Sequence, residues 1–335
     1  MSEGVGADGF RGVALAGPAR TLVGAGHRVR ALARSPASAG VVAAAGAEPV
    51  PGDVTDRDAL AEGMRSCAAV IHAAAHIAPW GPPQRFEQIN LGGADAVLAA
   101  ARSAGVRRLI HLSTEAVLAD GRPLIRVDET YPRPARPIGE YARTKALAEQ
   151  RVLAANGDRL TTVVLRPRFV WGPGDTTIVP ALARAVRLGR FAWVDGGRYL
   201  TSTCHVTNVC AGIRLAVEKA QAGEVYFLTD GEPVQFRDFL TALAATEGIA
   251  LPDRSVPREV AWALAGAAET TWRLLRLTSE PPITRTFLAL SGQEMTVDDS
   301  KARHQLGYHT VVSRRAGLAA LAAQSRASRS NPVPE

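Results

Sequence analysis

Residues 70–114, VIHAAAHIAPWGPPQRFEQINLGGADAVLAAARSAGVRRLIHLST, carry the pattern that decides the fold. The run Val70–Ala75 is almost continuously apolar, which is typical of a strand buried on both faces. Apolar side chains between residues 94 and 101 then follow the i, i+3, i+4, i+7 spacing of one helix face, and Gly105 is placed to end that helix. Leu109–Ser113 is a second apolar run. This order of strand, helix and strand predicts a parallel βαβ unit.

The same alternation continues on both sides of this stretch. A short strand is predicted at Val29–Ala33 before it, and a helix at Tyr141–Ala155 and a strand at Thr161–Leu165 after it. Repeated βαβ units predict an α/β fold with a doubly wound, Rossmann-type parallel sheet. After Pro167 strands and helices no longer alternate regularly, and the pattern is a loop, further helices and a short strand at Val225–Leu228. This change predicts a smaller C-terminal substrate-binding region.

The chain of 335 residues is long enough to bury a sizeable core in this arrangement. We predict a Rossmann domain over residues 1–170, joined by later strands from about residues 195–230, and a mainly substrate-binding region over 171–322. Residues 323–335 are mostly polar and contain two prolines, so we expect a disordered tail there.

Composition narrows the functional classes. The net charge is +7, but the arginines are scattered and aromatic residues make up only 5% of the chain, so we expect no nucleic-acid partner. The cysteines form no CxxC pair or zinc spacing, so we expect no metal site and a cytoplasmic protein with reduced thiols. Every apolar run is far shorter than the ~20 residues needed to cross a bilayer, so we expect no transmembrane segment.

Tyr141 and Lys145 are the candidate catalytic pair. They are spaced i, i+4 on a predicted helix, so their side chains lie on one face. A phenol with an ordinary pKa of about 10 is a poor acid or base near neutrality, and a neighbouring ammonium favours the phenolate. Such a tyrosine can exchange a proton with a carbonyl oxygen while a hydride is transferred. The alternative is an exposed helical pair without a function, but Lys145 is one of only three lysines in the chain.

Three polar positions follow predicted strands, where open α/β sheets bind their ligands. Thr114 ends the strand before the Tyr141 helix, where its hydroxyl can bind a substrate oxygen, and Asp53 follows the third strand, where its carboxylate can accept from an adenine amino group. Arg34 follows the second strand in place of the acid that binds the ribose 2′-hydroxyl of NAD, which favours a 2′-phosphate and therefore NADP. The alternatives are a turn-capping hydroxyl, a turn aspartate and a solvated loop arginine.

The start of the chain has two interpretations. Gly6, Gly9 and Gly12 have the G-x-x-G-x-x-G spacing that lets a backbone approach a pyrophosphate at a helix N-terminus. Only five residues precede this loop, however, and Pro18 falls inside the helix that should follow, where a proline costs ~3 kcal/mol. The second interpretation makes Val13–Ala16 the first strand, followed by a shortened loop. We prefer the first.

Together these segments resemble the extended branch of the short-chain dehydrogenase/reductase superfamily. Within that branch the chain is most similar to the 3-beta-hydroxysteroid dehydrogenase/isomerase-like and NAD-dependent epimerase/dehydratase group, although that family has a full apolar first strand. The shared segments, over roughly residues 20–320, are the glycine loop, Gly52-Asp53-Val54-Thr55-Asp56, Val70-Ile71-His72-Ala73-Ala74-Ala75, Asn90 before Ala94–Ala101, Leu112-Ser113-Thr114, Tyr141-x-x-x-Lys145, and Leu165-Arg166-Pro167 leading to Trp171-Gly172-Pro173-Gly174-Asp175.

The resemblance implies a role for each matched position. Tyr141 is the general acid/base, Lys145 holds the nicotinamide ribose and lowers the tyrosine pKa, Thr114 binds the substrate oxygen, and Asn90 completes the catalytic set. With the positions argued above, the predicted cofactor-binding set is Gly6, Gly9, Phe10, Gly12, Arg34, Asp53, Val54, Ala73, Ala74, Ala75, Leu112, Tyr141, Lys145, Pro167 and Phe169.

The resulting prediction is an NAD(P)-dependent oxidoreductase, a monomer or homodimer, that transfers a hydride between a nicotinamide and a small-molecule secondary alcohol or ketone. The segment Val260–Leu277 favours an apolar, steroid-like or terpenoid substrate if it is a lid, although core packing accounts for it equally well. One alternative is a nucleotide-sugar epimerase or dehydratase, with Arg166, Arg168 and Arg184 as candidate diphosphate ligands. Another is a non-catalytic dinucleotide-binding regulator, a class that tends to lack the Tyr-Lys pair.

Overall fold

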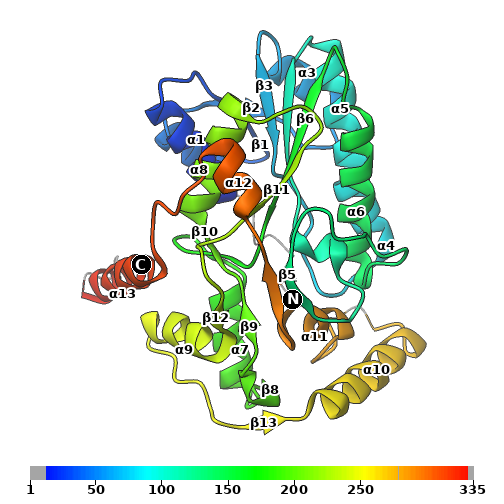
Figure 1. Cartoon of the computed structure of the whole chain (residues 1–335), viewed down its shortest axis with the longest axis vertical. Coiled ribbons are helices and arrows are strands. Elements are labelled where there is room, and N and C mark those ends of the chain that lie inside the picture. The colour runs from blue at the N-terminus through cyan, green and yellow to red at the C-terminus, as the bar shows by residue number, and fades with distance from the viewer. Residues whose placement is uncertain (1–12, 278, 331–335) are drawn as a thin grey trace.

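The computed structural model describes residues 13–277 and 279–330 (Figure 1). Its parallel strands are β1 (Arg30–Ala33), β2 (Glu48–Pro51), β3 (Ala69–His72), β4 (Arg108–Leu112), β6 (Thr161–Pro167) and β11 (Val225–Leu228). They form two pieces, with the strand orders β2-β1 and β3-β4-β6-β11, and every neighbouring pair is parallel. The predicted α/β class with a parallel sheet is therefore confirmed.

Helices cover both faces of this sheet. On one face lie α3 (Arg57–Gly63), α5 (Gly93–Ser103) and α6 (Gly139–Ala154), and on the other lie α8 (Val206–Lys219) and α12 (Ser300–Leu306). Successive side chains of a strand point to opposite faces, so Leu109 of β4 packs against the first group of helices and Ile110 against the second. Both side chains are completely buried. A strand with two covered faces explains the continuous apolar runs in the sequence.

The chain before β1 is helical where it is described. The interpretation of Val13–Ala16 as a first strand is wrong, because α1 (Val13–Gly24) begins there and includes Pro18. Although Pro18 removes a helical hydrogen bond, the buried Ala19 packs against Val42 of α2 (Pro36–Ala44), and α1 also packs on α8. Among the described strands, none pairs with both β1 and β3. The predicted phosphate loop lies outside the described residues, with its positions Gly6, Gly9, Phe10 and Gly12.

A second, mixed sheet lies below the parallel one (Figure 1). Its strands are β5 (Leu124–Val127), β9 (Leu200–Thr201), β12 (Val234–Gln235) and β14 (Met295–Val297), in the order β12-β9-β14-β5. Two short parallel pairs join β7 (Val170–Trp171) to β10 (Cys204–His205) and β8 (Trp193–Val194) to β13 (Ser255–Val256). Of the strands expected from about residues 195–230, only β11 joins the parallel sheet, because the two-residue strands β9 and β10 pair with other partners.

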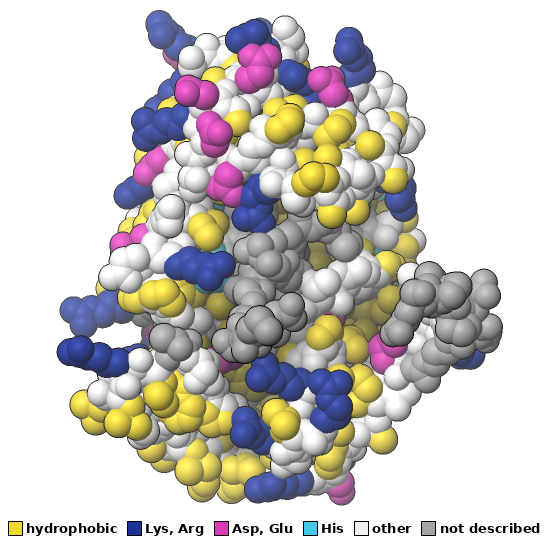
Figure 2. All heavy atoms as spheres, turned by 180° about the vertical axis from the view of Figure 1, so that it is seen from behind, with side chains coloured by type: hydrophobic (Ala, Val, Ile, Leu, Met, Phe, Trp, Pro, Cys, Tyr) yellow, Lys and Arg dark blue, Asp and Glu magenta, His cyan; other side chains and the backbone are white. Residues whose placement is uncertain are grey.

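The remaining helices surround this second part. They are α7 (Ile178–Arg187), α9 (Phe236–Thr246), α10 (Arg258–Leu274) and α11 (Arg285–Ser291), with the 3₁₀ turn η3 (Asp195–Gly197). The short α4 (Pro83–Phe86) packs on α6 instead. The solvent-facing side of α10 is apolar, with Leu264 57% and Leu274 78% exposed. Figure 2 shows apolar side chains gathered at this lower end of the molecule, with arginines or lysines among them. Among the helices of the described residues, none is long and apolar enough to cross a bilayer.

The C-terminal segment differs from the expected disordered tail over 323–335. The helix α13 (Arg314–Ser330) continues through most of that range, and residues 331–335 lie outside the described part. Leu318 and Leu321 pack against the buried Phe239 of α9, and Ser325 donates to Glu247 at 3.0 Å. The apolar spacing within the helix therefore outweighs the polar composition that predicted disorder.

Candidate active site

The Tyr141–Lys145 pair lies at the carboxyl end of β4. Both residues come from the first turns of α6, and the Lys145 ammonium donates to the Leu112 carbonyl at 2.6 Å. Leu112 is the last residue of β4, and His111 Nε2 lies 3.3 Å from the same ammonium. Lys145 is only 2% exposed, whereas Tyr141 is half-buried. The pair therefore occupies the edge of the sheet at which open α/β folds bind ligands.

Burial shifts the pKa values of Lys145 and of two histidines near it. It lowers the pKa of Lys145 to about 8, although the Glu149 carboxylate opposes the shift. Burial and the Lys145 charge also hold the pKa of His111 well below its usual range. The ring of His72 lies 5.1 Å from that of His111, and the same two causes lower the pKa of His72 to about 3. Both imidazoles are therefore neutral near neutral pH.

The environment of Tyr141 differs from the expected one. We expected Lys145 to lower its pKa, but burial and the Glu115 carboxylate raise that pKa, while a hydrogen bond with Thr114 opposes the rise. The physical reason is that burial removes the water that would solvate a phenolate, and Glu115 adds like charge. Lys145 meanwhile directs its ammonium to the Leu112 carbonyl. These surroundings therefore favour the protonated phenol over the phenolate.

Glu115 is a site residue that the sequence did not predict, and its partner is Arg168, which was predicted only as a candidate diphosphate ligand. Glu115 begins the 3₁₀ helix η2 (Glu115–Leu118), directly after Thr114, whose hydroxyl donates to Glu115 Oε2 at 2.8 Å. The other carboxylate oxygen accepts from Arg168 Nη1 at 3.0 Å, and both side chains are 5% exposed. Arg168 follows the end of β6, the neighbour of β4 in the sheet. The signal that was missed is a charged residue near the end of each of two neighbouring strands, with Glu115 shortly after β4 and Arg168 directly after β6.

The Ser113 hydroxyl is directed toward a buried carboxylate. Its hydroxyl donates to Glu149 Oε2 at 2.6 Å, and Glu149 also accepts from Arg133 and Arg166. Thr114 is therefore the strand-end hydroxyl that influences the Tyr141 phenol, whose pKa it lowers.

Two of the arginines suggested as diphosphate ligands have internal roles instead. Arg166 is 2% exposed and bonded to Glu149, and Arg168 is 4% exposed and bonded to Glu115. A buried cation must be paired, so these guanidiniums balance buried carboxylates instead of facing a ligand. Arg184, on α7, is exposed.

Asn90 connects two segments of the site through its side-chain hydrogen bonds. It lies in a π-helical segment, η1 (Glu87–Gly92), a rare element that is common at functional sites. Its carbonyl accepts from His76 N at 2.7 Å, and its amide donates to His76 O at 3.2 Å and to Thr144 Oγ1 at 2.9 Å. Thr144 is adjacent to Lys145 on α6. Asn90 thus fixes the segment after β3 to the helix that carries the catalytic pair, and both of its amide protons are already used.

Arg34 and Asp53, predicted from separate strand ends, lie side by side. Arg34 Nη1 donates to Asp53 Oδ2 at 3.3 Å, and the side chains are 41% and 39% exposed. Although burial opposes it, hydrogen bonds from Thr55 and Arg34 lower the pKa of Asp53. Val54 differs from these two, because its side chain is buried against Gly93 in the core and leaves only its backbone for a ligand.

The other predicted cofactor positions lie along the same edge. Ala73, Ala74 and Ala75 are half-buried directly after β3, where their small side chains leave room along the sheet edge. Pro167 is buried at the end of β6. Phe169 has φ +45°, a conformation that costs a non-glycine residue about 1–3 kcal/mol and that clusters at functional sites. Arg34 and Asp53 lie after β1 and β2, and Lys145 lies beside the end of β4, so all three are at the strand ends where open α/β folds bind their ligands.

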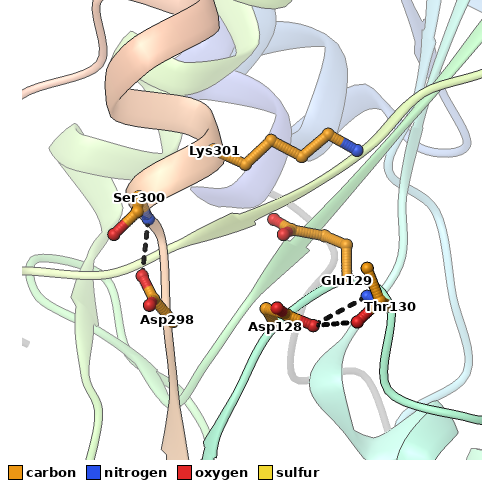
Figure 3. A pocket seen from close by; sticks show the side chains of 6 residues that line it. All are labelled: Asp128, Glu129, Thr130, Asp298, Ser300 and Lys301. Atoms are coloured by element: carbon orange, nitrogen blue, oxygen red, sulfur yellow. Dashed lines mark hydrogen bonds between the residues drawn. The ribbon is translucent and has the colours of Figure 1, made fainter.

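A separate cavity of about 300 Å³ lies between the end of β5 and the start of α12 (Figure 3). Asp298 accepts from the Ser300 backbone at 2.8 Å and Asp128 from the Thr130 backbone at 2.9 Å, so both carboxylates cap local turns. Lys301 donates to Glu224 at 2.5 Å. The cavity is lined by Asp128, Glu129, Thr130, Asp298, Ser300 and Lys301, and thus by none of the predicted site residues in the described part of the chain.

The parallel sheet, with a Tyr-Lys pair and a hydroxyl at its carboxyl edge, defines an NAD(P)-dependent oxidoreductase of the extended short-chain dehydrogenase type. Solved structures with a similar fold superpose on most of the chain. The gox2253 crystal structure is 29% identical, with a TM-score of 0.73, and the match covers 94% of this chain and 96% of that one. The dTDP-glucose 4,6-dehydratase DesIV of Streptomyces venezuelae, solved with NAD, is 22% identical with a TM-score of 0.72 over 96% of each chain, which shows the shared fold alone.

Within this class, residues 5–258 match the 3-beta hydroxysteroid dehydrogenase/isomerase family, and the chain belongs to that family. It is 51% identical to the 4-hydroxy-2-methyl-3-oxo-4-farnesyl-3,4-dihydroquinoline-1-oxide ketoreductase of Stigmatella aurantiaca, over 90% of each chain. It is 37% identical to the 2-alkyl-3-oxoalkanoate reductase of Stenotrophomonas maltophilia, over 96% of this chain and 98% of that one. These relatives are named as reductases of keto groups.

Proposed function

We propose that the chain interconverts a ketone and a secondary alcohol with Tyr141 as the general acid/base. The observation that carries the proposal is the Tyr141–Lys145 pair beside Thr114 at the carboxyl end of β4. When bound, a nicotinamide dinucleotide supplies or takes up the hydride. Tyr141 donates its hydroxyl proton to the carbonyl oxygen in reduction and takes a proton back in oxidation. Lys145 has three N–H groups, of which Leu112 and His111 engage two, so the third remains for a ribose hydroxyl.

We also propose that the preferred cofactor is NADP. Residue 34, directly after β1, is an arginine where an acid would bind the ribose 2′-hydroxyl of NAD. The Arg34 guanidinium has five N–H donors, and only one of them is hydrogen-bonded to Asp53. Several donors therefore remain for a 2′-phosphate.

The proposed substrate is an apolar ketone. Arg168 donates to the Leu290 carbonyl of α11 at 2.8 Å, which links the site to α11, and α11 packs on α10. The exposed face of α10 carries Leu264 and Leu274. The two relatives above are named for a farnesyl-substituted quinoline oxide and for 2-alkyl-3-oxoalkanoates, so both names include an apolar farnesyl or alkyl group.

The proposal is tested by measuring turnover of apolar ketones, hydroxysteroids and sugar nucleotides with NADPH and NADH. We expect reduction of an apolar ketone, and we expect Tyr141→Phe to lower kcat by about 10²–10⁴-fold because the proton donor is lost. Cofactor binding, measured as a rise in Tm on adding NADPH, should persist in Tyr141→Phe. Equal turnover in the variant, or turnover of sugar nucleotides alone, would contradict the proposal.

A further inference from the structure

We propose that His111 is a positioning residue for Lys145, because its imidazole accepts a hydrogen bond that fixes the ammonium and leaves the third N–H for a cofactor ribose hydroxyl. The inference rests on the proposed function, in which Lys145 binds that ribose. It assigns to His111 the upper limit of the pH range in which Lys145 binds the cofactor as a cation.

The strand β4 places His111 against the helix that carries Lys145. Alternate side chains of a strand share a face, so His111 points to the same side of the sheet as Leu109, toward α6. Its Nε2 lies 3.3 Å from the Lys145 Nζ, and the Leu112 carbonyl accepts from the same Nζ at 2.6 Å. His111 is 0% and Lys145 2% exposed. Bulk water therefore contributes little to solvating the ammonium, and its stability depends on these two acceptors.

The ammonium decides which nitrogen of the imidazole carries the proton. An ammonium has three N–H donors and no acceptor, so His111 Nε2 must accept, and the imidazole proton must lie on Nδ1. His111 Nδ1 is buried and has no hydrogen-bond partner among the described residues. An unsatisfied buried donor costs free energy. The polar contribution of this imidazole therefore comes from its contact with Lys145.

The other titratable groups around the ammonium do not supply this contact. His72 lies opposite His111 on β3, with the two rings 5.1 Å apart, and burial keeps both imidazoles uncharged near neutral pH. From α6, the Glu149 carboxylate favours the ammonium through its charge, but its oxygens are bonded to Ser113 and to two arginines. Tyr141 lies one helical turn earlier on α6. Loss of His111 would therefore remove one of the two acceptors that the described residues offer the ammonium.

The consequence concerns the pH at which Lys145 loses its charge. Burial lowers the pKa of Lys145 to about 8. A hydrogen bond to the charged form favours that form, so the His111 contact opposes this lowering. Without the contact the amine would become neutral at a lower pH, and a neutral amine is a weaker donor to a ribose hydroxyl. His111 thus extends to higher pH the range in which the ammonium binds the cofactor.

The test is the titration of Lys145 in His111→Leu, which removes the acceptor and keeps the position apolar. Because the chain has only three lysines, Lys145 can be followed by NMR with lysine labelled with carbon-13 at Cε, and its signal is assigned by its loss in Lys145→Met. We expect Lys145 to titrate about 1 pH unit below the wild type, because a hydrogen bond to a charged group is lost. The pH above which NADPH binding weakens should move down with it.

Two variants separate the hydrogen bond from the packing of the ring. His111→Gln retains a neutral acceptor, so its Lys145 titration should lie nearer to that of the wild type than the His111→Leu titration does. His72→Leu is the matched control, because it makes the same substitution at the neighbouring buried imidazole and keeps His111, so it should shift the titration less. If His111→Leu leaves the Lys145 titration unchanged, or shifts it no further than His72→Leu does, the inference is wrong.

The tautomer of His111 in the wild type is a second measurement, which remains decisive if His111→Leu folds poorly. In protein with nitrogen-15 histidine, assigned by the loss of a signal in His111→Gln, Nε2 should carry no proton below the pKa of Lys145. A proton on Nε2 there would overturn the inference. Neither NMR measurement needs a substrate. A wild-type protein that turns over none of the ketones would overturn the proposed function and this use of the contact, whereas the NMR results would still show whether His111 holds Lys145.

Discussion

The carboxyl edge of the sheet contains two ion pairs of similar length in different surroundings. Arg34–Asp53, after β1 and β2, is 3.3 Å long with side chains about 40% exposed, whereas Arg168–Glu115, after β6 and β4, is 3.0 Å long with side chains 5% exposed. Water screens the first pair, which should contribute at most about 1 kcal/mol. The second pair is shielded from water, so each of its charges needs the other to offset the free-energy cost of burial. Burial, not distance, therefore separates a pair that is available to a ligand from one that organises the site.

The largest effect should follow the loss of one partner of the buried pair. We expect Arg168→Met to lower the free energy of unfolding by about 3–5 kcal/mol, because Glu115 is left buried without its cation. Urea denaturation near neutral pH measures this difference.

The double variant Glu115→Gln/Arg168→Met is the control for the charge itself. It removes both charges from the same space, so it should recover a large part of the lost stability. If the double variant is as unstable as Arg168→Met, the loss reflects packing of the arginine, and the contrast between the two ion pairs fails.

The pH dependence of the free energy of unfolding gives a second test of burial, through Lys145. Its pKa is lowered from 10.5 to about 8 because burial disfavours the ammonium. Between these values the unfolded chain binds more protons than the folded one, so this residue's contribution to stability rises with pH. Relative to Lys145→Met, the wild type should gain about 1–3 kcal/mol from about pH 8 to about pH 10.5. Urea denaturation across this range measures the gain, and a constant difference for Lys145→Met would contradict the burial argument.

The sequence predicted the parts of this edge that depend on local spacing. The i, i+4 spacing placed Tyr141 and Lys145 on one helix face, and the strand at Val225–Leu228 has the predicted bounds. Arg34 and Asp53 were found because ligands bind where parallel strands end.

The buried network was not predicted because its partners are distant in the chain. Glu115 and Arg168 are separated by 53 positions and meet only through the pairing of β4 with β6. Nothing in a local pattern distinguishes the buried Arg168 from the exposed Arg34, since both directly follow a strand. The raised pKa of Tyr141 was missed for the same reason, because Glu115 rather than Lys145 dominates its charged surroundings.

The smallest effect on stability should come from the exposed pair. We expect Arg34→Ala to change the free energy of unfolding by less than about 0.5 kcal/mol, because water solvates Asp53 once the arginine is gone. Its effect on cofactor choice should be larger, since loss of a guanidinium–phosphate contact worth about 1.5–3 kcal/mol weakens NADPH binding by about 10–100-fold. Binding of NADH, which has no 2′-phosphate, should change little, and titrating both cofactors into both proteins measures the difference. Equal weakening of NADH and NADPH would show that Arg34 supports the sheet edge generally, and it would remove the functional contrast between the exposed pair and the buried one.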